Sequence, residues 1–76
     1  LPFVPTVLAC IPSSDGKSPC IVIGGEDGPV VVLDASGTPV RQDQLPDTPV
    51  KILFLPEERA VAFGTQDGHV AVCRGF

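Results

Sequence analysis

The chain contains an internal repeat, and this repeat constrains the fold more than any other feature. A leucine–proline segment near the start recurs after 44 residues, and a segment rich in glycine and valine recurs after 40 residues. The four-residue difference predicts an insertion in the first copy, around residues 15–18. The repeated residues are Leu1, Pro2 and Pro5, which recur as Leu45, Pro46 and Pro49, and Gly24, Asp27, Gly28, Val30 and Val32, which recur as Gly64, Asp67, Gly68, Val70 and Val72.

Both copies have the pattern of short strands and turns. Apolar residues come in runs of four to six, separated by Gly, Pro, Asp and Ser, and no window has a helical period. Asp27-Gly28 and Asp67-Gly68 are strong hairpin signals, and we expect a type I′ turn with positive φ at both residues of each pair. The expected strands are 6–11, 20–24, 30–33 and 39–43 in the first copy, and 50–55, 60–64 and 70–73 in the second.

These strands predict an all-β fold made of antiparallel, four-stranded β-propeller blades. A strand repeat of about 40 residues is the period of such blades, and continuous apolar runs such as 30–33 are typical of strands covered on both faces. We expect residues 1–44 to form a first blade and residues 45–76 a second, incomplete blade without its outer strand. Two blades cannot close a ring, so we expect a fragment of a larger propeller, with an exposed or borrowed edge along 70–73.

Size and charge limit the functions that the chain can have. A 76-residue chain is at most one small domain with a small margin of stability. The net charge is −4 and no Lys/Arg cluster is present, which argues against nucleic acid or an anionic membrane as the main partner. No apolar stretch is long enough to span a membrane. The basic residues are scattered along the sequence: Lys17, Arg41, Lys51, Arg59 and Arg74.

The three cysteines are Cys10, Cys20 and Cys73, and each lies in an apolar, strand-like run. We expect free thiols in the core, because unpaired cysteine behaves as a small hydrophobic residue. The odd number suits a reducing compartment, so we expect a cytoplasmic protein. A disulfide between Cys10 and Cys20 is the alternative.

The sequence offers no recognisable catalytic, cofactor or metal site. His69 is the only histidine, and no cysteine stands at a ligand spacing from it. The polar loop 13–18 lacks a glycine of the phosphate-binding motif and the carboxylates of a calcium loop. We therefore expect no catalytic residue, no cofactor and no metal, and a protein that is not an enzyme.

A shared acidic rim is the sequence feature that best fits partner binding. In a four-stranded blade, the turn between the second and third strands lies on the same ring face as the connection between blades. This face would carry four carboxylates, one amide and one histidine. A solvated surface is one interpretation, and a docking rim for a basic partner protein is the other. The rim residues are Glu26, Asp27, Asp47, Gln66, Asp67 and His69.

Two resemblances extend this interpretation. Segments 21–28 and 61–70 resemble blades of divergent WD-repeat-like propellers, although the chain has no tryptophan and thus no Trp-Asp ending. Segments 20–27 and 32–34, followed by Leu45-Pro46 and Pro49-Val50, are similar to the propeller of a Bardet-Biedl syndrome subunit of the BBSome, a ciliary membrane-cargo coat. This resemblance implies a scaffold that docks an Arf-like small GTPase in its GTP form, at the cilium. No GTPase-contacting residue is carried over from it.

The sequence therefore predicts a non-enzymatic protein-interaction scaffold that presents short, rigid loops to a partner protein. Two alternatives stay open. One is part of a propeller enzyme, with Asp47 or His69 as its contribution to a site shared between blades. The other is a small protein that closes a ring of four or six blades by self-association, with residues 1–4 of a neighbour covering the open edge.

Overall fold

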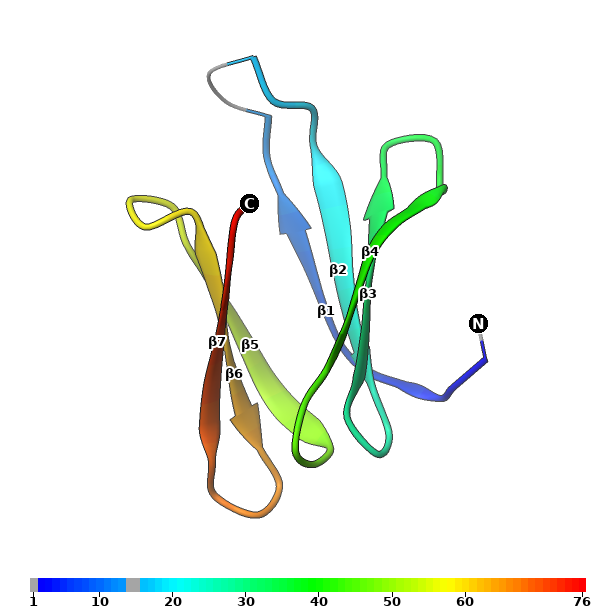
Figure 1. The fold of residues 1–76 in the computed structure, drawn as a ribbon, viewed down its shortest axis with the longest axis vertical. Coiled ribbons are helices and arrows are strands. Elements are labelled where there is room, and N and C mark those ends of the chain that lie inside the picture. Colours follow the sequence, from blue (N-terminus) through cyan, green and yellow to red (C-terminus); the bar gives the residue numbers. More distant parts are fainter. Residues whose placement is uncertain (1, 14–15) are drawn as a thin grey trace.

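The computed structural model describes residues 2–13 and 16–76, which form two antiparallel sheets with no helix in those ranges (Figure 1). Each sheet is a meander in which neighbouring strands are consecutive in sequence. The predicted strands are confirmed, with ends that differ by no more than one residue. The first sheet contains β1 (Pro5–Ile11), β2 (Cys20–Gly25), β3 (Pro29–Asp34) and β4 (Pro39–Gln44), and the second contains β5 (Pro49–Leu55), β6 (Ala60–Thr65) and β7 (Val70–Arg74).

The sequence repeat is also a structural repeat. Leu8 pairs with Ile23 in the first sheet, and the corresponding residues Ile52 and Phe63 pair in the second. Both β1 and β5 carry an irregularity in register just after their first proline. The connection between β1 and β2 spans 12–19, whereas the one between β5 and β6 spans only 56–59. This difference accounts for the predicted insertion, of which Asp15 lies outside the described residues.

The two glycine-containing hairpins do not have the same turn. Asp27 and Gly28 have φ values of 72° and 96°, so positive φ at both residues is confirmed. At the second turn only Gly68 has positive φ, and the predicted type I′ geometry is wrong there. The two loops have the same length, since the last paired residues are Gly24 with Val30 and Gly64 with Val70. In the second loop the Asp67 carboxylate accepts from the Thr65 hydroxyl at 2.5 Å and from the His69 amide at 3.4 Å, whereas Gly25, which corresponds to Thr65, has no hydroxyl to donate.

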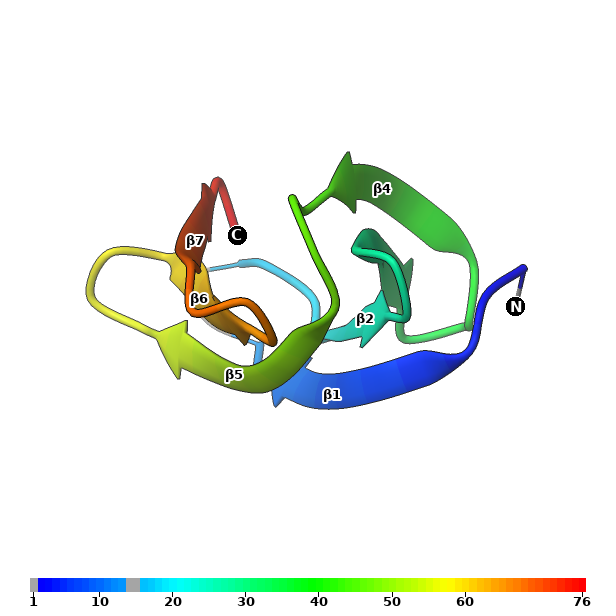
Figure 2. The same cartoon turned by 90° about the horizontal axis from the view of Figure 1, so that it is seen from below.

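The hydrophobic core lies between the sheets. One face of the first sheet contributes Ile11, Val22 and Val30, and one face of the second contributes Val61 and Phe63. All five side chains are at most 1 % exposed. β1 and β5 lie side by side where the sheets meet (Figure 2). Each sheet therefore covers one face of the other, and each has a second face directed outward.

The outer edges of the two sheets differ in character. The first sheet ends at β4, whose sequence is largely polar. The second ends at β7, and no further strand pairs with β7 among residues 2–13 and 16–76, as expected for segment 70–73. The all-β antiparallel class is thus confirmed, and the two sheets do not close on themselves. The propeller and its division into blades 1–44 and 45–76 stay predictions. No helix suited to crossing a membrane occurs in the described part of the chain.

The cysteines are free, but they are not equivalent. Cys20 and Cys73 are half-buried against the core, and burial is the main cause that raises the pKa of both thiols. Cys10 is exposed, so the prediction of a core thiol is wrong for this residue. Cys10 lies on β1 between core-facing neighbours, and alternate side chains of a strand point to opposite faces.

Thiol labelling at pH 8 distinguishes these environments. We expect one thiol, that of Cys10, to react quickly in the native protein, and those of Cys20 and Cys73 to react slowly, because the thiolate is the reactive form. Three equal, fast reactions are expected in denaturant. Mass spectrometry after brief labelling identifies the residue, and equal native rates for all three would contradict this assignment.

Candidate functional site

The connections that carry the predicted rim residues lie at the same end of the molecule. The turn between β2 and β3, the connection between β4 and β5, and the turn between β6 and β7 are all at the bottom of Figure 1. Five of the six rim residues are exposed, and Asp47 is half-buried. The structure therefore brings together the six residues named from the sequence: Glu26, Asp27, Asp47, Gln66, Asp67 and His69.

Thr48 links these three connections through hydrogen bonds. Its hydroxyl oxygen accepts from the Asp27 amide at 2.9 Å, and its carbonyl accepts from the Gln66 amide at 2.8 Å. The Leu45 amide also donates to the Gly28 carbonyl at 2.7 Å. Because the connection between the sheets is bonded to both hairpin turns, the rim residues are held on one framework.

A second network fixes the end of the rim on the second sheet. The Asp67 carboxylate accepts from the Thr65 hydroxyl at 2.5 Å and pairs with His69 Nδ1 at 2.9 Å. The His69 amide donates to the Thr65 hydroxyl oxygen at 3.0 Å. Thr65 is buried, whereas the His69 side chain is 67 % exposed. The network thus anchors an accessible imidazole on a buried threonine.

The hydrogen bonds and charges of this network shift the pKa values of Asp67 and His69. The hydrogen bond from Thr65, followed by that from His69, lowers the pKa of Asp67 from 3.8 to about 2. The hydrogen bond and charge of Asp67 raise the pKa of His69, and Asp47 adds to this effect. Asp67 therefore stays ionised through the physiological range, and His69 gains positive charge as the pH falls.

Substituting Asp67→Asn is expected to lower the pKa of His69 toward 6.5, its ordinary value, because the imidazolium loses its main partner. The histidine contribution to stability is full below the unfolded pKa and lost as pH rises through the higher folded pKa. The Asp67 contribution is present above 3.8 and lost as pH falls toward about 2. NMR titration of the single imidazole measures the first shift. Glu26→Gln is the control, and an equal shift in both variants would contradict the assignment.

The arrangement does not have the geometry of a nucleophile and its base. The Asp67 carboxylate lies between the Thr65 hydroxyl and the imidazole, whereas an activated hydroxyl donates to the histidine itself. Among residues 2–13 and 16–76, no group of three His, Cys, Asp or Glu side chains could hold a metal ion. What the rim offers is four carboxylates on connections whose backbones are bonded together, one of which, Asp67, is held beside a titratable histidine.

The opposite end of the molecule carries a basic cluster that sequence reasoning missed. Lys17 Nζ and Arg59 Nε donate to the Phe76 carbonyl at 3.3 and 2.7 Å. The Arg41 guanidinium lies 4.6 Å from the centroid of the Phe76 ring. The interpretation of the basic residues as scattered is therefore wrong for three of them. They come from three separate segments, and no spacing in the sequence signals that the fold gathers them around one residue.

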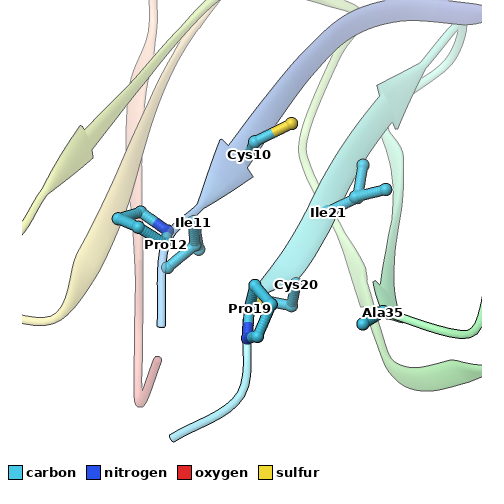
Figure 3. Close-up of a pocket in the computed structure, with 7 residues that line it drawn as sticks. All are labelled: Cys10, Ile11, Pro12, Pro19, Cys20, Ile21 and Ala35. Atoms are coloured by element: carbon cyan, nitrogen blue, oxygen red, sulfur yellow. The ribbon is translucent and has the colours of Figure 1, made fainter. Parts of the chain in front are cut away.

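An apolar hollow of about 330 Å³ lies at the ends of β1 and β2. Figure 3 shows the lining residues: Cys10 on β1, Ile21 on β2, Pro12 and Pro19 at the two ends of the connection between these strands, and Ala35 just after β3. The lining offers little to bind a polar ligand. In the second sheet, the repeat places the larger Phe54 at the position of Cys10.

Comparisons with protein-family models, with curated proteins and with solved structures gave no match.

Proposed function

We propose that this chain is a non-enzymatic protein-interaction scaffold, part of a β-propeller, whose acidic rim docks a basic surface of a partner protein. The observation that supports it best is the bonding of three connections through Thr48. A loop that is fixed before binding loses less conformational entropy when the partner binds.

The charge of the rim defines the partner's chemistry. Four carboxylates, those of Glu26, Asp27, Asp47 and Asp67, lie at one end of the molecule, and only His69 among the six rim residues can be cationic. Complementary charge steers association and is screened over about 8 Å at physiological salt. We therefore expect binding that weakens as salt is added.

The resemblance to a BBSome propeller suggests the first partner to test, an Arf-like small GTPase in its GTP form. The same proposal places the protein in the cytoplasm and at the cilium. The remaining blades, supplied by a parent propeller or by other chains, would be further partners.

The test combines charge reversal with a control at the other end. The chain is immobilised, and an Arf-like GTPase loaded with a non-hydrolysable GTP analogue is passed over it. Glu26→Lys with Asp47→Lys is expected to weaken binding at least tenfold at low salt. The matched control, Glu57→Lys with Glu58→Lys in the connection between β5 and β6, makes the same charge change and should leave binding unchanged.

Two outcomes contradict the proposal in different ways. No binding of the GTPase in either nucleotide state removes this partner. Binding that is weakened equally by both double variants shows an effect of net charge alone, and removes the rim as the docking site.

A further inference from the structure

The two sheets pack through unlike faces. The first sheet contributes a face with Ile11, Val22 and Val32, which we name the front face. The second contributes a face with Val61 and Phe63, which we name the back face. Residues paired across antiparallel strands share a face, so both faces extend over their neighbouring strands. The packing is therefore front to back.

The repeat places a second front face on the open side of the second sheet. Shifting the front-face residues of β2 and β3 by 40 positions, and those of β1 by 44, leads to residues of β6, β7 and β5. Leu53, Val70 and Val72 on this side are 63, 76 and 45 % exposed. The second front face consists of Leu53, Leu55, Ala62, Gly64, Val70 and Val72.

The same shift in reverse places a second back face on the open side of the first sheet. Leu8 corresponds to Ile52 and Cys10 to Phe54, and both Leu8, at 62 %, and Cys10 are exposed. The centre of this face is already buried, with Ile23 at 7 %. The second back face consists of Leu8, Cys10, Ile21, Ile23, Val31 and Leu33.

The contact between Gly24 and Pro49 in the front-to-back interface involves two residues whose repeat counterparts, Gly64 and Pro5, lie on the open faces. A Cβ on Gly24 would lie 2.8 Å from Pro49 Cγ, so this glycine makes room for the proline. At Gly64, which corresponds to Gly24, the nearest atom to a Cβ would be Lys51 Cβ at 3.7 Å. Pro5, which corresponds to Pro49, is exposed, whereas Pro49 is fully buried. The open space at Gly64 could therefore hold a proline, and the exposed Pro5 has no such space to occupy within the chain. The two lie on opposite outer faces of the molecule.

We propose that a second copy of this chain binds head to tail, with the second back face of one copy on the second front face of the other. Pro5 of the added copy then occupies the space at Gly64. The repeat identifies a second copy as the binding partner. The first sheet of that copy would pack on the second sheet of this one in the same way as the second sheet packs on the first sheet within the chain. A head-to-tail contact leaves one face open at each end, so it builds a ring or an open chain of copies.

Two single variants and their mixture test this pairing by sedimentation velocity over a series of concentrations. The unaltered chain is expected to form species larger than one chain. Val72→Lys removes the second front face, Leu8→Lys removes the second back face, and each alone should sediment as a monomer. An equimolar mixture should give a dimer and nothing larger, because each variant supplies the face that the other lacks.

Val40→Lys is the matched control, since Val40 is 59 % exposed on β4 and lines a hollow with Val32 and Arg41 on the front-face side of the first sheet, away from both proposed contact faces. It should associate like the unaltered chain. Circular dichroism checks that each variant keeps its sheet signal, and Leu53→Lys replaces Val72→Lys if that variant does not fold.

A monomer at every concentration overturns the proposal. Self-association of Leu8→Lys with loss only in Val72→Lys also overturns it, because this result shows two like faces in contact. Neither result bears on the rim, which is tested by GTPase binding and not by association of the chain.

Discussion

Phe63→Ala is expected to unfold the chain at room temperature. Phe63 has the largest fully buried side chain, at 0 % exposure, and it lies in the core between the two sheets. Truncating a buried phenylalanine costs about 3–5 kcal/mol through lost burial and the cavity that remains. A core of this size rarely supplies more than about 3–5 kcal/mol of net stability. The loss therefore equals the whole margin.

Urea unfolding followed by circular dichroism measures the effect. The control is Leu53→Ala on neighbouring β5, where the side chain is 63 % exposed and where we expect a change of about 0.5 kcal/mol or less. The measurement is made at low concentration, so that any association of copies does not contribute. A native sheet signal and a cooperative transition in Phe63→Ala would contradict the placement of this ring in the core.

Gly28→Ala is expected to have the second largest effect, a loss of about 2–4 kcal/mol from strain and overpacking together. Gly28 has a φ of 96°, a conformation that L-residues rarely adopt. A Cβ there would lie 2.4 Å from the Leu45 carbonyl oxygen. Leu45 cannot move away easily, because its own amide is bonded to the Gly28 carbonyl at 2.7 Å.

Gly68→Ala is the matched control for this substitution. Gly68 is the repeat counterpart, with a φ of 92°, but nothing lies within 4 Å of the position that a Cβ would take. We expect a loss of about 1 kcal/mol from backbone strain alone. Urea unfolding of both variants compares the two effects. Equal losses would show that the contact with Leu45 contributes nothing.

Local pattern was sufficient to predict the strands. Apolar runs separated by turn residues predicted six of the strands, and the polar segment that begins at Pro39 predicted β4 as an edge strand. Alternation, β-propensity and turn residues act over a few neighbouring residues, so these signals are local. The rim could also be located, since five of its residues stand in the two hairpin turns at equivalent parts of the repeat and Asp47 stands in the connection between the sheets. The type I′ prediction is wrong at Asp67, where the Thr65 hydroxyl bonds to the Asp67 carboxylate and to the His69 amide.

Contacts between residues that are far apart in the sequence could not be predicted from local sequence patterns. Cys10 was placed in the core because its run is apolar, although its side chain points to the outer face of the first sheet. Lys17, Arg41 and Arg59 are scattered in the sequence and meet at Phe76. The titration of His69 depends on Asp67 and Asp47, and the second of these belongs to another connection.

The repeat, the strands and the residues of the rim can all be identified from the order of the amino acids. Each of these depends on the order of neighbouring residues, which sets strand direction, side-chain alternation and turn position. The covered face of each sheet, the charges that lie together and the close contact of Gly28 with the Leu45 backbone become visible in the folded structure alone. These depend on the distance between segments that are far apart in the chain, and the packing of the two sheets on one core sets that distance.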